Sequence, residues 1–392
     1  MHHVVDEGPI RFSLGVAVSS VLDEEPLWGM NVGPPSSGKT VVQELLSGVA
    51  DDQVDELTVA GLLTWSKGGK RGTPARPVGL LPRIGERGFA TIGDFSTILA
   101  GSDHNGRDQL FGDLRRVYDG KFSRNMDSPD GQPLRWAGRL TLLAAVTPAI
   151  DRYSSHTDAL GPRWLYIRTE AASTPDKLAA AQKARRRGGA AEHRKVIRAA
   201  AAALVAKGRR VVAEVDLSDD AHDALDDAAL VACWGRASVP RQTWGRRDVD
   251  GVAVIEEPPR LVRQLVTLAR CLVAIGDTEQ TAVDLARRCA LDTVPAARRD
   301  CLTYLSNGEE ATVSDIARYT RHHRDVIRRA LEDLQIVGLA SCPIREGADV
   351  DQEDPPNRTA PSPWTLNGDD GELAFKVLTD HRRAQKRAQE EA

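Results

Sequence analysis

The chain has 392 residues, of which 41% are hydrophobic and 28% are charged, and its formal net charge is −4. This length is sufficient for two or three domains, each with its own hydrophobic core. The net charge neither indicates nor excludes binding to nucleic acid, because any basic surface has to be local.

The cysteines and the apolar segments exclude several classes of protein. The five cysteines are odd in number and form no CxxC pair, which argues against a disulfide scaffold or a zinc site and fits a reducing cytoplasm. No apolar run reaches the roughly 18 residues that a membrane-spanning helix requires, and the first residues do not resemble a signal peptide. We therefore expect a soluble cytoplasmic protein with no membrane partner.

A phosphate-binding loop is the most specific motif in the sequence. Residues 33–40 read GPPSSGKT and match G-x-x-x-x-G-K-[ST]. An apolar run at 26–32 predicts a buried strand before the loop, and apolar residues at helical spacing in 40–49 predict a helix after it. In that setting backbone N–H groups hold phosphates, Lys39 reaches the β and γ phosphates, and the Thr40 hydroxyl is a ligand of Mg²⁺. The predicted binding residues for ATP and Mg²⁺ are Gly33, Pro34, Pro35, Ser36, Ser37, Gly38, Lys39 and Thr40.

Three further strands are predicted, each with a polar residue at one end. Residues 89–92 are followed by Asp94, which would hold Mg²⁺ or orient the attacking water, although Gly93 precedes it where many ATPases have a second acid. Residues 140–146 are followed by Thr147, placed to touch the γ-phosphate if this strand lies beside the loop strand. Arg163 precedes the strand 164–167 and could serve a neighbouring subunit's site. The alternatives are a surface aspartate, an ordinary turn threonine and a surface ion pair.

A β-hairpin is predicted between the second and third of these strands. The segments KFSRNM and PLRWAGRL flank DSPDGQ, which contains a Pro-Asp-Gly turn signal. Lys121, Arg124 and Arg135 are its basic residues. They would contact DNA phosphates without sequence preference, or would be ordinary solvated charges.

The order of these segments resembles the ATPase core of minichromosome-maintenance helicases and their AAA+ relatives. Gly93-Asp94-Phe95 falls on the family's acid-acid-Phe position, residues 144–148 (AAVTP) on its AAxNP element, and Pro162-Arg163-Trp164 on its SRF element. The resemblance implies a hexameric ring of subunits, in which Thr147 is the sensor residue and Arg163 is the arginine finger. It further implies that the hairpin grips DNA and that a lid helix beginning at PPRLVRQL carries a sensor arginine, with Arg260 as first choice and Arg263 as second.

The C-terminal part predicts a second type of DNA-binding element. Residues 298–344 predict helix, turn, helix, turn, helix and strand, and SPWTLN predicts a second strand after a polar insert. This pattern resembles a winged helix-turn-helix domain, which binds DNA or, as an alternative, another protein. Basic residues at or near the start of its recognition helix are Arg321, His322, His323, Arg324 and Arg328.

The expected fold class is an α/β P-loop AAA+ domain with an α-helical lid, followed by a winged helix-turn-helix domain. We expect the ATPase core at 1–172, the lid and linker at 173–296, the winged helix at 297–370 and a charged tail at 371–392. The expected function is an MCM-like helicase or DNA translocase in replication of a phage or mobile element. The chain has neither the N-terminal oligonucleotide-binding barrel nor the zinc cysteines of the replicative helicases. The alternative is therefore an ATP-switched, DNA-binding initiator, helicase loader, or defence or transposition regulator without unwinding activity.

Overall fold

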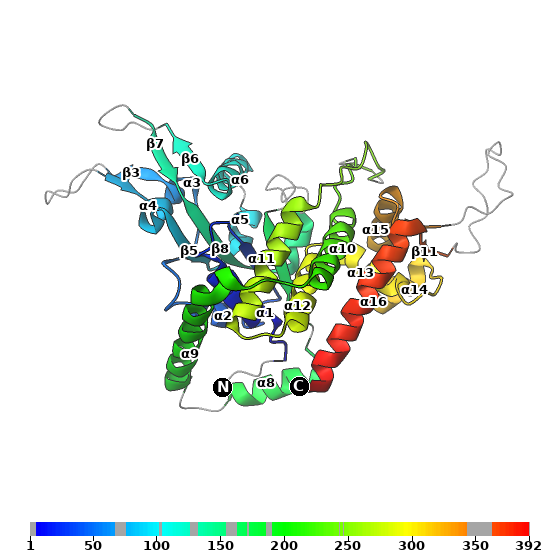
Figure 1. Cartoon of the computed structure of the whole chain (residues 1–392). Coiled ribbons are helices and arrows are strands. Elements are labelled where there is room, and N and C mark those ends of the chain that lie inside the picture. The colour runs from blue at the N-terminus through cyan, green and yellow to red at the C-terminus, as the bar shows by residue number, and fades with distance from the viewer. Residues whose placement is uncertain are drawn as a thin grey trace. The chain divides into compact units, whose positions relative to one another are not determined.

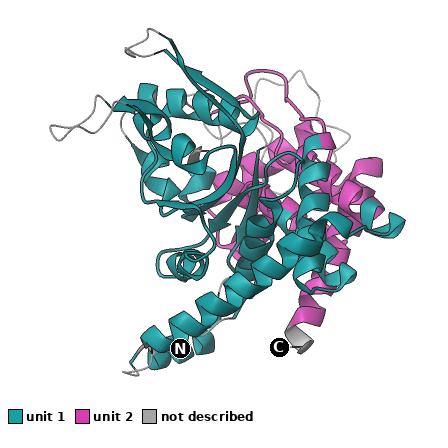
Figure 2. Cartoon of the chain, turned by 60° about the vertical axis from the view of Figure 1, so that its left-hand side comes forward, with its two compact units in different colours: residues 1–222, 260–289 teal, residues 223–259, 290–392 magenta. Residues whose placement is uncertain are grey.

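The structure is a computed structural model that describes residues 5–66, 76–101, 104–125, 132–153, 163–170, 172–185, 190–242, 244–245, 247–342 and 363–391. The chain packs as two compact units (Figure 2). The first unit comprises residues 1–222 and 260–289, and the second comprises 223–259 and 290–392. The segment 173–296, expected to form one lid and linker, is thus divided between the two units.

A parallel five-stranded sheet lies at the centre of the first unit (Figure 1), so the α/β class is as predicted. Its strands are β1 (Trp28–Val32), β2 (Asp52–Val54), β5 (Arg87–Ile92), β8 (Arg139–Val146) and β9 (Trp164–Arg168), in the order β2-β5-β8-β1-β9. The strand that leads to the loop is therefore an inner strand, and the strand that leads to Thr147, at the centre of the sheet, lies directly beside it. All the strands run in one direction, so their carboxyl ends meet at one edge.

The sheet is buried on both faces, which explains why its central strands read as continuous apolar runs. Every residue of β1 is buried, and so is β8 from Leu140 onward. Trp28 lies fully in the core, where its indole N–H donates to the carbonyl of Leu140 at 2.6 Å. A buried indole that has a partner carries no desolvation penalty, which makes this large side chain favourable at the centre of the sheet.

One face of the sheet is covered by α1 (Gly8–Ser19), a helix not predicted from the sequence. Its Phe12 packs so closely on β1 that a Cβ at Gly29 would lie 2.7 Å from the phenyl Cζ. The helices α2 (Lys39–Leu45), α9 (Ala190–Val211) and α11 (Pro259–Ile275) belong to the same unit. Further described elements there are α8 (Thr174–Ala184), the short η2 (Val212–Glu214) and most of α12 (Glu279–Asp292).

The opposite face packs against the helices that follow β2, β5 and β8. They are α3 (Val59–Leu62), α4 (Leu80–Ile84), α5 (Phe95–Ala100), α6 (His104–Tyr118) and the short η1 (Pro148–Tyr153). Phe95 and Phe111 stack in this layer, with ring centroids 6.3 Å apart and planes nearly parallel. Alternate residues of β1 and β8, among them Met30 and Leu142, point into the same hydrophobic cluster.

Two antiparallel hairpins extend outward at one side of the first unit (Figure 1). One pairs β3 (Thr64–Ser66) with β4 (Arg76–Val78), and the other pairs β6 (Lys121–Arg124) with β7 (Leu134–Ala137). The second is the hairpin that the sequence predicts, although its turn at 126–131 lies outside the described residues. Its alternation is clear, because Phe122 and Trp136 pair across the strands and are both buried.

The second unit contains most of α10 (Asp219–Gly235), together with α13 (Ala296–Leu305), α14 (Val313–Thr320), α15 (Arg324–Ile336) and α16 (Gly368–Glu391). The strands β10 (Ala340–Ser341) and β11 (Thr365–Leu366) pair antiparallel. The helices and paired strands follow the order that the sequence predicts for 298–366. Assignment of this arrangement to the winged-helix class remains a prediction, and the insert at 345–361 lies outside the described residues.

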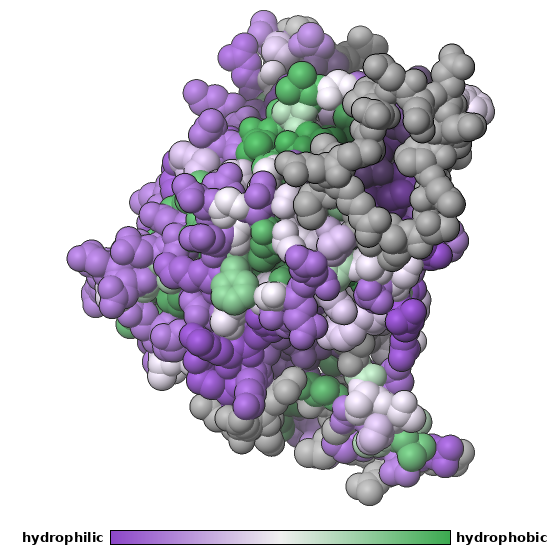
Figure 3. Space-filling model, turned by 90° about the vertical axis from the view of Figure 1, so that its right-hand side faces the viewer, coloured by the Kyte–Doolittle hydropathy of each residue, from purple (hydrophilic) through white to green (hydrophobic). Residues whose placement is uncertain are grey.

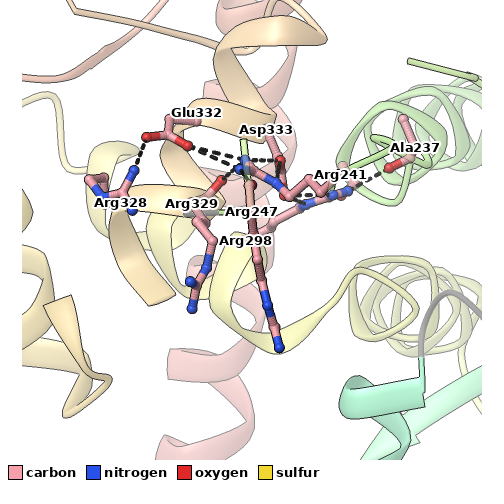
Figure 4. Close-up of polar contacts among 9 residues, drawn as sticks. Ala237, Arg241, Arg247, Arg298, Arg328, Arg329, Glu332 and Asp333 are labelled. Carbon is pink, nitrogen blue, oxygen red and sulfur yellow. Dashed lines mark hydrogen bonds and ion pairs between the residues drawn. The ribbon is translucent and has the colours of Figure 1, made fainter. Parts of the chain in front are cut away.

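A buried carboxylate fixes α15 within the second unit. Figure 4 shows Arg241 and Arg298 converging on Asp333 of this helix. Arg298 donates to Asp333 Oδ2 at 2.8 and 3.1 Å and to the Ala237 carbonyl at 2.6 Å. Arg241 donates to Asp333 Oδ1 at 2.5 and 3.0 Å and to the Arg329 carbonyl at 3.1 Å. One acid therefore joins α15 to α13 and to the segment that follows α10.

None of the described helices is long and apolar enough to cross a membrane. The face drawn in Figure 3 is largely hydrophilic, and its apolar residues gather in small, separate areas.

Candidate nucleotide-binding site

The loop 33–40 joins the carboxyl end of β1 to α2, as the motif requires. Its backbone has the left-handed conformation at Ser36, with φ of 63°, and at Gly38, with φ of 90°. At Gly33 a Cβ would lie 2.5 Å from Ser37 Oγ and 2.8 Å from Thr169 Oγ1, so a larger residue there would displace these two hydroxyl groups. Turns that mix right- and left-handed residues point successive N–H groups into a concave surface that binds anions.

Two polar side chains of the loop are suited to a phosphate group. Lys39 Nζ donates to the carbonyls of Gly33 at 2.5 Å and Pro34 at 2.8 Å, so its ammonium group lies folded over the loop. Burial lowers the pKa of Lys39, and the negative charge of Asp94 opposes this shift. The Ser37 hydroxyl is buried, and no residue in the described part of the chain pairs with it. A phosphate oxygen would satisfy that hydroxyl, so the residues present fit an ATP phosphate.

Ser96 links the two strand-end residues predicted from the sequence. Asp94 caps α5, because its Oδ1 accepts a hydrogen bond from the Ser96 backbone N–H at 2.8 Å. The Ser96 hydroxyl donates to Thr147 Oγ1 at 3.1 Å and accepts from the Thr147 backbone N–H at 2.9 Å. The sequence reading missed Ser96, although its position two residues after a capping aspartate was a usable signal.

A pocket of about 590 Å³ opens beside the loop. Its lining includes Thr40 on one side and Asp94 on the other, so the structure brings these two predicted Mg²⁺ ligands to one cavity. The full lining is Thr40, Gln43, Glu44, Ser47, Gln53, Val54, Asp55, Thr91, Gly93, Asp94 and Arg198. In the described part of the chain no three His, Cys, Asp or Glu side chains form a metal cluster. This is compatible with Mg²⁺, which proteins commonly hold with one or two carboxylates plus substrate phosphates.

Three charged residues of this pocket, Glu44, Asp55 and Arg198, were not predicted from the sequence. Asp55 follows β2, whose three residues are too few and too polar to give a strand signal. Arg198 lies on α9, and its guanidinium is 3.9 Å from the carboxylate of Glu44 on α2. The Ala-rich sequence of α9 predicts a helix but not which residues face the site. An acid immediately after a short strand was the signal that could have identified Asp55.

Arg163 and Arg260 lie at the opposite edge of the sheet, away from the loop of their own chain. Arg163 precedes β9 and ion-pairs with Asp119 at 3.2 Å, and Arg260 lies 3.8 Å from Glu25, which precedes β1. Both guanidinium groups pack over the ring of Tyr118, at 5.4 Å and 6.0 Å. Burial, with a further contribution from Glu25, raises the pKa of Tyr118, so its hydroxyl stays neutral.

The structure therefore does not bring these arginines to the site within one chain. The second-choice arginine, Arg263, pairs with Glu25 at 3.0 Å and belongs to the same edge. The side chain of Arg163 is only 12% exposed. Any role in a neighbouring subunit's site requires it to leave these contacts.

The three hairpin residues that were predicted to contact DNA have two kinds of surroundings. Lys121 and Arg135 are exposed on the two strands. Arg124 instead donates to the carbonyls of Val59 at 2.9 Å and Leu63 at 3.0 Å, which ties the hairpin to the body of the first unit. Arg124 is thus engaged in a structural contact, which makes it a poor candidate for DNA binding.

The predicted residues around the start of α15 also differ in their surroundings. Arg321 and Arg324 are exposed, and Arg321 ends α14 in the left-handed conformation. His323 caps α15, and Arg328 pairs with Glu332 one turn further along. His322 lies 3.0 Å from Asp300 of α13. Burial alone would raise the pKa of Asp300, but the hydrogen bond from His322 and the charge of Arg299 outweigh burial and lower it.

No protein-family model matches the chain, and no curated protein matches it either. Functional inference therefore depends on the residues and their arrangement.

Proposed function

We propose that the chain is a DNA-linked P-loop ATPase. The observation that carries this proposal is the convergence of three strand ends on one site. The β1 loop with Lys39 and Thr40, the β5 end with Asp94 and the β8 end with Thr147 lie at the carboxyl edge of neighbouring parallel strands. Ligands of open α/β sheets bind at this edge.

In the proposed reaction the loop holds the phosphates of ATP through its N–H groups and Lys39. Lys39 exchanges its two loop carbonyls for phosphate oxygens, and Ser37 gains the partner that it lacks. Mg²⁺, held by Thr40, Asp94 and the phosphates, would neutralise charge on the phosphoryl oxygens. Asp94 orients the attacking water, and Ser96 keeps Asp94 and Thr147 in register with each other.

The proposal includes assembly into a ring of like subunits. Arg163 and Arg260 lie on the sheet edge opposite the loop, so a neighbour docked there would receive them at its own nucleotide site. A charge-stabilising arginine supplied by a second subunit is a recurring arrangement in phosphoryl transfer. DNA would bind through exposed basic residues, of which Lys121 and Arg135 belong to the hairpin and Arg321 and Arg324 to the second unit.

The experiment is a measurement of ATP hydrolysis with and without DNA, for the wild type and for Lys39→Ala. We expect hydrolysis by the wild type that rises on addition of DNA, and none above background for Lys39→Ala. Equal rates for the two proteins would contradict the proposal, and so would hydrolysis that does not respond to DNA.

A second candidate is an ATP-switched DNA-binding regulator that does not unwind DNA. Gly93 favours it, because the position expected to carry an acid has no side chain, which would slow turnover. Strand displacement on a forked duplex separates the two candidates. Unwinding that requires Lys39 supports a helicase, whereas ATP-stimulated DNA binding without unwinding supports the switch.

A further inference from the structure

The space beside Gly93 contains a carboxylate from the neighbouring strand. A Cβ built on Gly93 would lie 3.3 Å from Oδ1 of Asp55 and 3.4 Å from its Cα. The acid that many ATPases with a phosphate-binding loop have at position 93 would thus lie next to Asp55. A carboxylate thus lies next to the position that a side chain at residue 93 would occupy.

The strand register accounts for this placement. Strands β2 and β5 are parallel, with Val54 opposite Ile92, and the Gly93 N–H donates to the Val54 carbonyl at 2.8 Å. Asp55 is the next residue after Val54, just as Gly93 is the next residue after Ile92. Paired residues of parallel strands point to the same face of a sheet, so Asp55 projects on the face where a side chain at 93 would project.

That face is the wall of the nucleotide pocket. Gln53 and Asp55 on one strand and Thr91 and Gly93 on the next, each pair two residues apart, all line it. Val54 and Asp94 line it as well, so this wall takes in the carboxyl ends of both β2 and β5. The pocket also contains Asp94, so it receives one carboxylate from each of two neighbouring strands.

Asp55 differs from the other two aspartates of its segment, Asp51 and Asp52. Asp51 accepts a hydrogen bond from the Phe89 backbone N–H at 2.8 Å, and Asp52 pairs with Arg83 at 2.5 Å. Asp55 is exposed and makes no hydrogen bond or ion pair with any other residue that the structure describes. The two partnered aspartates have structural contacts, whereas Asp55 has only the pocket.

We infer that Asp55 is the second acid of the nucleotide site and acts in place of an acid at position 93. This inference rests on the proposed function. Asp55 and Asp94 together would favour a divalent cation bound with the nucleoside triphosphate, because two carboxylates attract it more strongly than one. The same geometry explains why residue 93 is a glycine. An acid at position 93 would place its carboxylate next to that of Asp55, and the two negative charges would repel each other.

The test measures binding of Mn²⁺, as a spectroscopic substitute for Mg²⁺, by electron paramagnetic resonance in the presence of a non-hydrolysable ATP analogue. The variant is Asp55→Asn, and the matched control is Glu56→Gln, the adjacent exposed acid that does not line the pocket. We expect the Mn²⁺ affinity of Asp55→Asn to fall about tenfold, the loss typical of removing a supporting metal-site group. The control should match the wild type, and analogue binding in EDTA should be equal in all three proteins.

A carboxylate exchange provides the second arm. Asp55→Ala with Gly93→Asp moves the acid from one strand to the next, and it should bind Mn²⁺ more tightly than Asp55→Ala alone. An Mn²⁺ affinity of Asp55→Asn equal to the wild-type value would overturn the inference. An exchange variant that melts like the wild type but stays as weak as Asp55→Ala would overturn it too. A wild type that binds no analogue would refute the proposed function itself, a distinct outcome.

Discussion

Asp94 has two roles that a single substitution separates. Its carboxylate caps α5 through the Ser96 N–H, and its charge acts on Lys39 across the site. Asparagine is as good a helix cap as aspartate, so Asp94→Asn keeps the first role and removes the second. We expect thermal stability close to that of the wild type and an ATP hydrolysis rate at least about a hundredfold lower, the lower end of what a positioned acid or base contributes.

Steady-state hydrolysis and a thermal melt measure the two quantities. An Asp94→Asn variant that hydrolyses ATP at the wild-type rate would remove Asp94 from the site. Asp94→Asn and Asp55→Asn each remove one carboxylate charge from the pocket. The ATP hydrolysis that remains in Asp94→Asn is therefore best compared with that of Asp55→Asn under the same conditions.

At the scale of single elements, different basic residues of the β6–β7 hairpin are expected to bind DNA and to hold the hairpin in place. Lys121 and Arg135 are exposed, whereas Arg124 donates to two main-chain carbonyls. In Lys121→Ala with Arg135→Ala, we expect the slope of log binding constant against log salt to fall by about 2, because each phosphate contact contributes roughly 1.

Arg124→Ala is the matched comparison for the hairpin. It leaves two carbonyl groups without their donor, so we expect a loss of about 1–2 kcal/mol in the free energy of unfolding of the first unit. Urea denaturation and salt-dependent DNA binding measure the two effects. An unchanged salt slope in the double variant would contradict DNA binding through the hairpin.

Helix α15 depends on Asp333 for its position. Asp333→Ala would leave Arg298 buried without its acid, and Arg241 with Glu332 alone at 3.2 Å. Removing one partner of a buried ion pair typically costs about 3 kcal/mol or more, so we expect the second unit to unfold at lower urea concentration. The control is Asp325→Ala on the same helix, an exposed residue for which little change is expected. Equal denaturation midpoints for the two variants would contradict this account of α15.

The elements predicted well from the sequence are those whose burial leaves a pattern. The strands β1, β5, β8 and β9 are apolar runs because both faces of a parallel sheet are covered. The strand β2 is a short edge strand of Asp52, Gln53 and Val54, so it leaves no such pattern, and Asp55 was missed with it. The polar residues at the ends of β5 and β8 could be predicted, because a break from apolar to polar marks a strand end.

The direction in which a side chain points was harder to predict from the sequence than whether its segment forms a helix or a strand. The helix α9 could be predicted, but its alanines are distributed around it, so no apolar face indicated that Arg198 turns towards the pocket. The pairing of Arg163 with Asp119 joins residues far apart in the chain, and no local pattern encodes it.

At the scale of the whole molecule, the first unit has its loop on one edge of the sheet and its candidate arginines on the other. Assembly would place the arginines of one subunit at the loop of the next. Mixing Arg163→Ala with Lys39→Ala should therefore restore part of the ATP hydrolysis that each variant lacks alone, because mixed interfaces contain an intact loop and an intact arginine. No recovery in mixtures shown to co-assemble would contradict a role for Arg163 in a neighbouring site.

Binding of ATP at the loop tests the central claim most directly. Isothermal titration of the wild type and of Lys39→Ala with ATP and Mg²⁺ measures it without requiring turnover, DNA or assembly. We predict saturable binding by the wild type and a loss of at least about tenfold in affinity for Lys39→Ala, because a charged hydrogen bond to phosphate contributes about 1.5–3 kcal/mol. Absence of binding to the wild type, or equal affinity in the two proteins, would contradict the account.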